Sequence, residues 1–269
     1  MNRTLRTLRV LFLIVGVVAG IAGVVMLVAP DETDRYFSWP IGPPALAATV
    51  GGFYVASAIV FTRAAFSDDW PAARGLCVGV VALTVPTVVF TIRHHEVFDF
   101  GRWQAIAWIV LFVAAPIAYG TILFVQRGQV AGTSGDALAP WARAVVAVLA
   151  LGYAVLALVL WVDPTGTADR APYALPAMSG RFLGCWAAFL TALAVFVVVR
   201  NRWHEARTPV LALTLWPVGG LVGALRSFDD LAPPGRRAVY LVGLAVAGAA
   251  GALVLAAGRA RVSASAPHR

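Results

Sequence analysis

Eight long runs of apolar residues recur along this 269-residue chain, and they constrain its fold more than any other feature. A membrane-spanning helix needs roughly 20 predominantly apolar residues, because the hydrocarbon core of a bilayer is about 30 Å thick. The composition agrees, since 60% of the residues are hydrophobic and 13% are charged. We therefore expect an all-α integral membrane protein with eight transmembrane helices. The runs cover residues 10–28, 45–62, 75–92, 103–125, 142–162, 182–199, 210–225 and 238–257.

Arginines and acids are distributed unequally over the segments between these spans. The chain has no lysine, so all 21 basic residues are arginines. With the N-terminus in the cytoplasm, 13 of the 21 arginines fall on the cytoplasmic side and nine of the 13 acids fall on the other side. Cytoplasmic segments of membrane proteins carry the excess of positive charge, so we expect both termini in the cytoplasm. The net charge of +8 is then a topology signal and requires no nucleic-acid partner.

Several unlike features recur after a shift of 132 to 134 residues, which indicates an internal duplication. We predict two parallel four-helix repeats, 1–127 and 141–261, joined by a Gly-rich cytoplasmic linker at 128–140 and followed by a disordered tail at 262–269. Because each repeat has an even number of spans, both repeats start from the cytoplasm. The recurring pairs are WPAAR 70–74 and WHEAR 203–207, Pro30 and Pro164, Gly52 and Gly184, Arg93 and Arg226, and Gly101-Arg102 and Gly235-Arg236.

Tryptophans lie at the ends of several spans, where an amphipathic ring prefers the membrane interface. We expect such an interfacial belt to include Trp39, Trp103, Trp141 and Trp161. Prolines within spans predict helix kinks, because proline lacks the backbone N–H of a regular helix. These prolines are Pro86, Pro116 and Pro217.

The segment TIRHHEVFDFGRW at 91–103 places two histidines between the third and fourth spans. On a regular helix His94 and His95 diverge by about 100°, so one metal ion cannot easily take both as ligands. Asp99 would share a face with His95, but the second repeat has no histidine in this loop. We favour a solvated loop and expect no metal or cofactor site. A metal or haem ligand set and a pH-sensing or partner contact are the alternatives.

The interior of the spans carries no charged side chain, which disfavours ion-coupled transport by a buried acid. The hydroxyls of Thr84, Thr87 and Thr214 can bond to their own helices or line a permeation path. Arginines at the span ends can snorkel to the interface or contact a lipid phosphate or an anionic substrate. These arginines are Arg93, Arg181 and Arg226.

The chain contains no P-loop, dinucleotide fingerprint, HExxH, GxSxG or paired CxxC motif, so an enzyme is the less favoured class. We expect a non-catalytic scaffold, accessory or lipid-binding protein whose partners are membrane lipids and other membrane proteins. The alternative is a permease for a small neutral or amphiphilic solute, which requires a polar-lined void between the repeats. A weaker alternative is a metal or haem membrane enzyme that uses His94 and His95.

Two segments carry a resemblance to other proteins: YFSWPIGPPALAATVGGFYVASAIVFTRAAFSDDWPAAR at 36–74 and YALPAMSGRFLGCWAAFLTALAVFVVVRNRWHEAR at 173–207. They resemble a group of uncharacterised polytopic membrane proteins of actinobacteria and related bacteria. That group combines a Trp-Pro-rich approach, an Arg-Phe-Leu-Gly-type helix start and a Trp-x-x-Ala-Arg turn. The first half departs from this pattern, since Thr49 stands where the second half has Arg181. The resemblance implies the fold and a location in a bacterial plasma (inner) membrane, and it brings no activity.

Overall fold

The computed structural model describes residues 3–67, 70–128, 137–232 and 234–265. Within them, eight helices are long and apolar enough to cross a membrane, which confirms the eight predicted spans. The described residues contain no β-strand, so this part of the chain is all-α. The long helices are α1 (Arg3–Val28), α3 (Pro44–Ala65), α4 (Trp70–Arg93), α5 (Trp103–Val125), α6 (Pro140–Val162), α8 (Ala177–Arg200), α9 (Trp203–Arg226) and α10 (Pro234–Ser265).

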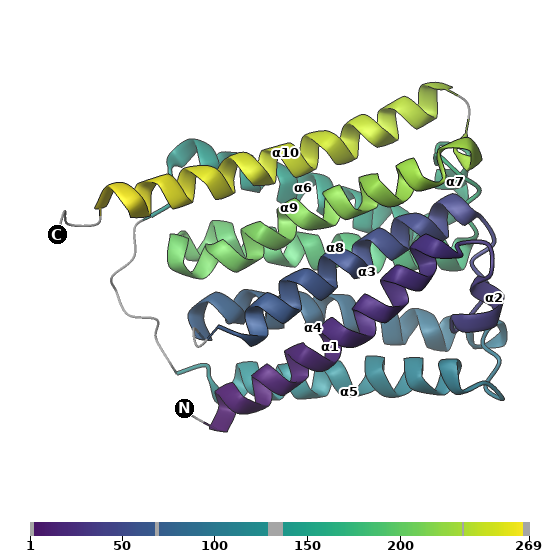
Figure 1. Cartoon of the computed structure of the whole chain (residues 1–269), viewed down its shortest axis with the longest axis horizontal. Coiled ribbons are helices and arrows are strands. Elements are labelled where there is room, and N and C mark those ends of the chain that lie inside the picture. Colours follow the sequence, from purple (N-terminus) through teal and green to yellow (C-terminus); the bar gives the residue numbers. More distant parts are fainter. Residues whose placement is uncertain (1–2, 68–69, 129–136, 233, 266–269) are drawn as a thin grey trace.

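Successive long helices run in opposite directions, so α1 begins and α10 ends at the same end of the bundle (Figure 1). We call this the termini end. We call the other end of the bundle the opposite end. The described connections there contain four short elements: α2 (Thr33–Tyr36), η1 (His95–Val97), α7 (Pro164–Ala168) and η2 (Phe228–Asp230).

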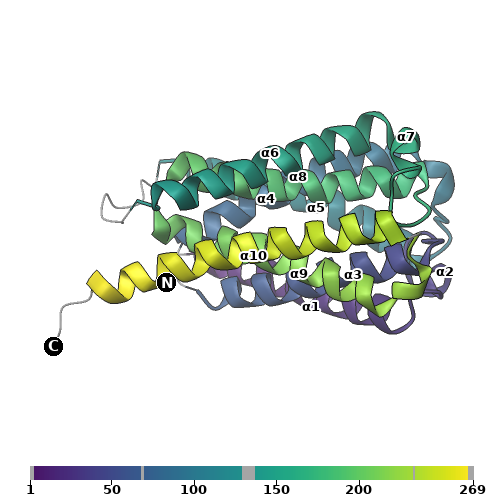
Figure 2. The same cartoon turned by 90° about the horizontal axis from the view of Figure 1, so that it is seen from above.

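Of the eight long helices in the described residues, four form the centre of the bundle and four pack on the outside of these, and Figure 2 shows the same bundle from above. Within the most apolar windows of α3, α4, α8 and α9, between 44% and 67% of the residues are buried, against 17% to 28% for α1, α5, α6 and α10. Each outer helix packs on an inner one: α1 on α3, α5 on α4, α6 on α8, and α10 on α9. The inner helices join the two halves of the sequence, because α3 packs on α9 and α4 packs on α8.

Glycines allow α3 and α9 to cross with their backbones in contact. A Cβ atom built on Gly52 would overlap the carbonyl group of Gly219, and one built on Gly219 would overlap the carbonyl of Gly52. Gly223 lies in the same way against the backbone of Ala48. Lipid tails are as apolar as the helices, so helices associate in a bilayer mainly through such close packing and through polar contacts. These glycines therefore hold the two halves together at the centre of the bundle.

The helices are generally longer than the apolar runs that predicted them. α9, for example, begins at Trp203, because a helix continues into the interface where polar residues can follow it. α10 continues to Ser265, into the expected C-terminal tail. Most of the expected linker lies outside the described residues, and α6 begins at Pro140.

Trp39 does not belong to the predicted interfacial belt. Its side chain is 2% exposed and lies at the centre of an aromatic cluster near the opposite end. The ring packs edge-on against Phe90 of α4, Trp108 of α5 and Phe182 of α8, with centroid distances of 6.2, 4.8 and 5.2 Å. The residues around Trp39 thus fold inward between three helices. Trp103 and Trp141, by contrast, are exposed.

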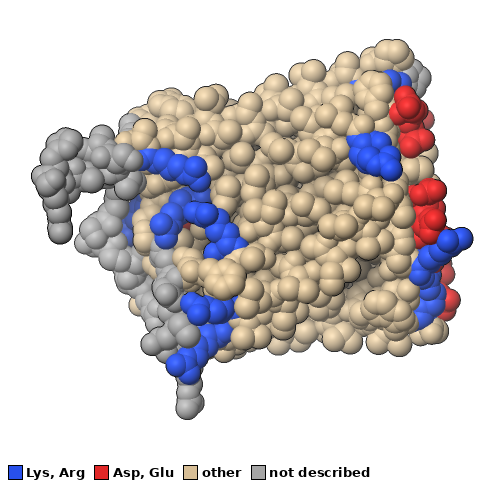
Figure 3. Space-filling view, in the orientation of Figure 1, with Lys and Arg blue, Asp and Glu red and all other residues tan. Residues whose placement is uncertain are grey.

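Charged side chains gather at the two ends of the bundle, and the surface between them is almost uncharged (Figure 3). Most of the acidic side chains visible in this view lie at the opposite end, whereas a cluster of arginines lies at the termini end. The apolar belt is the surface that a bilayer would cover.

Candidate functional site

α6 is attached to the bundle mainly along one side, and a groove lies on each side of it. The helix packs along α8 and makes a much smaller contact with α10. Figures 1 and 2 show α6 and α10 as neighbouring outer helices that flank α8 and α9. The first groove lies between α4, α6 and α8, and we call it the α4–α6 groove. The second lies between α6, α8 and α10, and we call it the α6–α10 groove.

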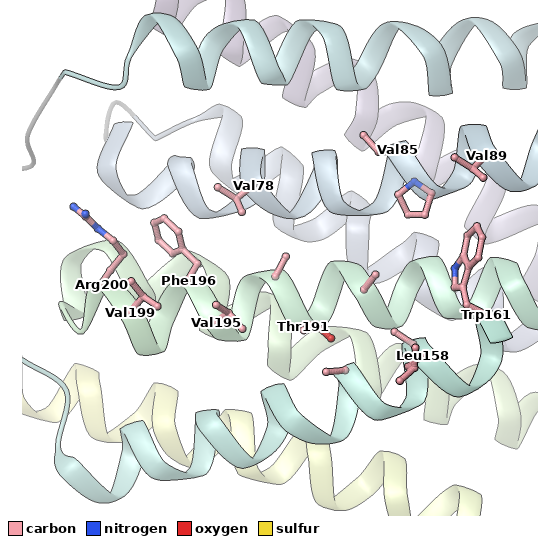
Figure 4. Close-up of a pocket in the computed structure, with 15 residues that line it drawn as sticks. Val78, Val85, Val89, Leu158, Trp161, Thr191, Val195, Phe196, Val199 and Arg200 are labelled. Carbon is pink, nitrogen blue, oxygen red and sulfur yellow. The ribbon is translucent and has the colours of Figure 1, made fainter.

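The α4–α6 groove is an apolar depression that is open along the outside of the bundle and has a volume of about 870 Å³. Valines of α4 and alanines of α6 and α8 form much of its surface, which is wide because these side chains are small. Figure 4 shows Trp161 of α6 towards one end and Arg200 of α8 at the other. The lining predicts an apolar occupant such as a lipid tail.

Arg200, at the termini end of this groove, already has an acidic partner. Its Nε and Nη2 donate hydrogen bonds of 2.7 and 3.0 Å to the carboxylate of Glu205. Glu205 lies in the first turn of α9 and its side chain is 1% exposed. A buried carboxylate is tolerated when it is paired and hydrogen-bonded in this way. The charge of Arg200 is therefore largely neutralised within the protein.

The α6–α10 groove has a volume of about 610 Å³ and begins at the opposite end of the bundle. α6 and α10 form its walls, α8 forms its floor, and α7 with the loop behind it forms its rim. Along α6 the lining runs from Val148 to Leu160, which is about 18 Å at a rise of 1.5 Å per residue. That length is close to one leaflet of a bilayer whose hydrocarbon core is about 30 Å thick.

Tyrosine hydroxyls connect one wall of the α6–α10 groove to the centre of the bundle. Tyr173 and Tyr240 both line the groove, and their hydroxyl oxygens lie 3.5 Å apart. The Tyr240 hydroxyl donates to Thr49 Oγ1 of α3 at 3.2 Å, and Thr49 donates to the Ala45 carbonyl oxygen at 2.8 Å. Burial and the neighbouring Tyr240 hydroxyl raise the pKa of Tyr173 well above its usual value, so the Tyr173 hydroxyl remains a neutral donor and acceptor.

Two deeper residues of the same groove have polar atoms with no partner in the described structure. They are the hydroxyl of Tyr153 on α6 and the indole Nε1 of Trp186 on α8. Both residues lie nine positions in from the opposite end of their helices, which is about 14 Å. An unmade hydrogen bond costs about 1–3 kcal/mol when the group is buried.

Two arginines occur at the opposite end of the α6–α10 groove. Arg170 is an exposed residue of the rim. Arg236 is exposed in the first turn of α10, and the helical period puts it on the face that carries Val239, Tyr240 and Gly243. Within the described part of the chain, neither guanidinium forms an ion pair with an acidic residue. The groove therefore combines an apolar interior, which we call the shaft, with one arginine on its rim, Arg170, and Arg236 lies one helical turn beyond its lining residues Val239 and Tyr240.

Arg181 and His94, which the sequence left as separate features, are in contact. Arg181 is 9% exposed, and its Nη1 lies 2.9 Å from His94 Nε2. An arginine can only donate, so this contact needs a neutral imidazole with its proton on Nδ1, which lies 3.6 Å from Glu96 Oε1. Burial and the charge of Arg181 lower the pKa of His94. The pair connects the start of α8 to the loop after α4.

The other two residues of the possible metal site make contacts of their own, although His95 Nδ1 lies 3.6 Å from Oε2 of the same Glu96 carboxylate. The side chain of His95 is 72% exposed, and its Nδ1 lies 3.2 Å from the Ile92 carbonyl oxygen. Asp99 Oδ1 accepts a hydrogen bond from the Gly101 backbone N–H at 3.0 Å, which is a local turn contact. Among the residues that the structure describes, no three His, Cys, Asp or Glu side chains come together as metal ligands.

The mid-span threonines are buried and are satisfied by their own helices. Thr84, Thr87 and Thr214 donate to the carbonyl oxygens of Val80, Leu83 and Val210 at 2.7, 2.7 and 2.9 Å. None of these threonines lines either groove. The two arginines that end α4 and α9, Arg93 and Arg226, are exposed at the opposite end.

Sequence reasoning missed the grooves and the residues that define them. Arg170 has no sequence signal of its own, since it stands in a loop that also contains Asp163 and Asp169. Gly152 and Gly243 could have signalled a gap, because a Cβ built on either meets no atom within 4 Å. Both line the α6–α10 groove. Glycines elsewhere on the chain serve close packing, however, so spacing alone does not separate the two uses.

Comparisons of this chain with protein-family models, with curated proteins and with solved structures find no match.

Proposed function

We propose that this protein is a non-catalytic integral membrane protein that binds membrane lipid in the grooves beside α6. The observation that carries the proposal is the attachment of α6, which packs mainly on α8 and leaves an apolar groove on each side. Volumes of about 870 and 610 Å³ are in the range of small-molecule sites. Both grooves are lined mostly by aliphatic and aromatic side chains, which suits the hydrocarbon part of a lipid.

Lipid binding has more support than solute permeation. A permease path between the halves would need free polar groups, but Thr84, Thr87 and Thr214 donate to their own helices. The contact of Gly52 with Gly219 also brings α3 and α9 together where the halves meet. Polar residues inside a membrane usually mark transport paths, and the lining of the two grooves is poor in them.

We also propose that the two halves are parallel repeats with both termini in the cytoplasm of a bacterial cell. The helix pairs α1–α3, α4–α5 and α3–α9 correspond in this register to α6–α8, α9–α10 and α8–α4, and all six pairs are in contact. Helices of the two halves are therefore interleaved at the centre. The arginines at the termini end and the acids at the opposite end (Figure 3) agree with positive-inside topology. The resemblance to actinobacterial polytopic proteins is part of the same proposal.

Native mass spectrometry in a mild detergent, followed by lipid extraction, tests the function. The two groove-filling variants are Ala157→Trp for the α4–α6 groove and Gly152→Trp for the α6–α10 groove. Ala114→Trp is the matched control, because Ala114 is exposed on α5 and lines neither groove. We expect the wild type and the control to retain lipid, and each groove variant to retain less.

Equal lipid retention by all four proteins would contradict the proposal. A flux of neutral solute through wild-type proteoliposomes that neither groove variant reduces would favour the permease instead. Stoichiometric metal or a haem absorption band in the purified protein would favour the enzyme.

A further inference from the structure

We propose that the α6–α10 groove is a specific site for one lipid with an anionic headgroup, held at its mouth by Arg170 and Arg236. This inference rests on the proposed lipid binding and adds the chemical class of the ligand, its orientation and the residues that select it. The lipid would enter from the leaflet at the opposite end of the bundle, which is the outer leaflet in the proposed topology.

The apolar shaft cannot by itself select a lipid. A tail in the groove exchanges one hydrocarbon environment for another, so there is no hydrophobic free energy to retain it over bulk lipid. Selectivity must come from polar groups that a headgroup can reach. The groove extends about 18 Å along α6, so a tail that fills it leaves its headgroup at the rim.

The two groove residues with unpartnered polar atoms are too deep for a headgroup. Tyr153 and Trp186 lie about 14 Å from the helix ends, and their orphaned atoms are enclosed by protein. The contact must therefore be made at the mouth of the groove. Tyr173 and Tyr240 occupy the wall near the mouth, but their hydroxyls are engaged with each other and with Thr49.

Arg170 and Arg236 are the groups at the mouth that can select a charge. Arg170 lines the rim, and Arg236 lies one turn before the groove-lining Val239 and Tyr240 on the same face of α10. No acid of the described chain pairs with either guanidinium. Arginine binds phosphate oxygens through paired N–H groups and sheds its hydration easily. The α4–α6 groove lacks this feature, because Arg200 is paired with Glu205.

The two halves differ at two positions of the helices α5 and α10, the second of which forms one wall of this groove. The register that pairs Gly101 with Gly235 also pairs Trp108 with Val242 and Phe112 with Val246. The rings of Trp108 and Phe112 lie 4.0 Å apart, and Trp108 is part of the aromatic cluster around Trp39. In the second half, smaller valines stand in place of these two rings, and Val246 lines the groove.

The test is native mass spectrometry of the full-length protein in detergent with equimolar phosphatidylglycerol and phosphatidylcholine that carry the same tails. Arg170→Gln/Arg236→Gln removes the proposed headgroup contacts, and Arg35→Gln/Arg102→Gln removes two other arginines of the opposite end as a charge-matched control. Gly152→Leu/Gly243→Leu places two side chains in the shaft, and the added Cβ has open space at both positions. Gly120→Leu, also in open space but outside the groove, is its control.

We expect the wild type and both controls to retain one phosphatidylglycerol in preference to phosphatidylcholine by about 30-fold, since each of two arginines that meet an anionic lipid contributes about 1 kcal/mol. The arginine variant should bind both lipids equally, and the glycine variant should retain neither. Unchanged selectivity in the arginine variant, with loss of lipid in the glycine variant, would overturn this inference and leave the proposed function intact. If the wild type retains no lipid, both are overturned.

Discussion

His94 makes a pH-dependent contribution to stability through its hydrogen bond with Arg181. The folded protein lowers the pKa of His94, while in the unfolded chain a histidine titrates near 6.5. The unfolded state therefore binds the proton more readily, so this contribution is fully present above about pH 6.5 and is lost as the pH falls towards the folded pKa. In thermal unfolding from pH 7.5 to pH 5, we expect the wild type to lose more stability than His94→Gln, which can still accept from Arg181.

The neighbouring histidine provides the control for this prediction. His95 is largely exposed, so His95→Gln should keep the pH dependence of the wild type. If His94→Gln and His95→Gln change that dependence to the same extent, the His94–Arg181 contact is not its origin.

Glu205 is the second residue whose chemistry depends on charged partners, which are Arg200 and, with its Nη1 3.8 Å from Glu205 Oε1, Arg202. Its carboxylate is buried and accepts two hydrogen bonds from Arg200, whose own side chain is 32% exposed. Because water can still reach Arg200, Glu205→Gln should cost about 1.5–3 kcal/mol, the range for a hydrogen bond to a charged group. Glu32→Gln breaks the exposed pair with Arg35 and should cost at most about 1 kcal/mol. Equal losses in denaturant titrations of the two variants would contradict the buried role of Glu205.

These two contacts show which part of the site the sequence could predict. Glu205 and Arg200 are five residues apart, and their proximity was visible, although the burial of the carboxylate was not. His94 and Arg181 are 87 residues apart. Their contact depends on α4 lying beside α8, which no local pattern of residues encodes.

At the level of helices, the crossing of α3 and α9 depends on glycine at two facing positions. A methyl group on Gly219 would meet the carbonyl of Gly52, so Gly219→Ala must separate the helices. Overpacking of this kind costs on the order of 1–3 kcal/mol, and we expect that loss in the free energy of unfolding. Gly120→Ala has open space on α5 and should be neutral or stabilising, since alanine favours a helix by about 1 kcal/mol over glycine. A Gly219→Ala protein as stable as Gly120→Ala would show that the crossing is not tight.

Hydropathy predicted all eight spans because the bilayer sets the same length and apolarity for each of them. It also treated the eight helices alike, whereas the structure separates a buried inner set from an exposed outer set. Both sets must be apolar, one towards protein and the other towards lipid, so composition cannot distinguish them. Trp39 shows the same limit of prediction from composition. A tryptophan beside the end of a span can face the membrane interface or turn inward, and Trp39 turns inward.

At the level of the whole molecule, the proposed eight spans predict that the two termini lie on one side of the membrane. Positive-inside topology predicts that this side is the cytoplasm. Single cysteines test it in a background where the buried Cys77 and Cys185 are replaced by alanine. Gly128→Cys, after α5 at the termini end, should resist a membrane-impermeant maleimide in intact cells, and Thr165→Cys, at the opposite end, should react. The reverse labelling pattern would invert the topology, and labelling of both positions would contradict the eight-span arrangement.

The grooves are a property of the assembled molecule. They form because α6 packs mainly on α8 and stands away from α4 and α10, and because small side chains line the spaces between these helices. The most direct measurement is a cryo-electron microscopy structure of the protein in nanodiscs of bacterial lipid. We predict continuous tail density along the α6–α10 groove, ending in headgroup density beside Arg170. A map in which α6 closes against α10, or in which lipid density in the groove is no stronger than along the exposed face of α5, would contradict the proposed function.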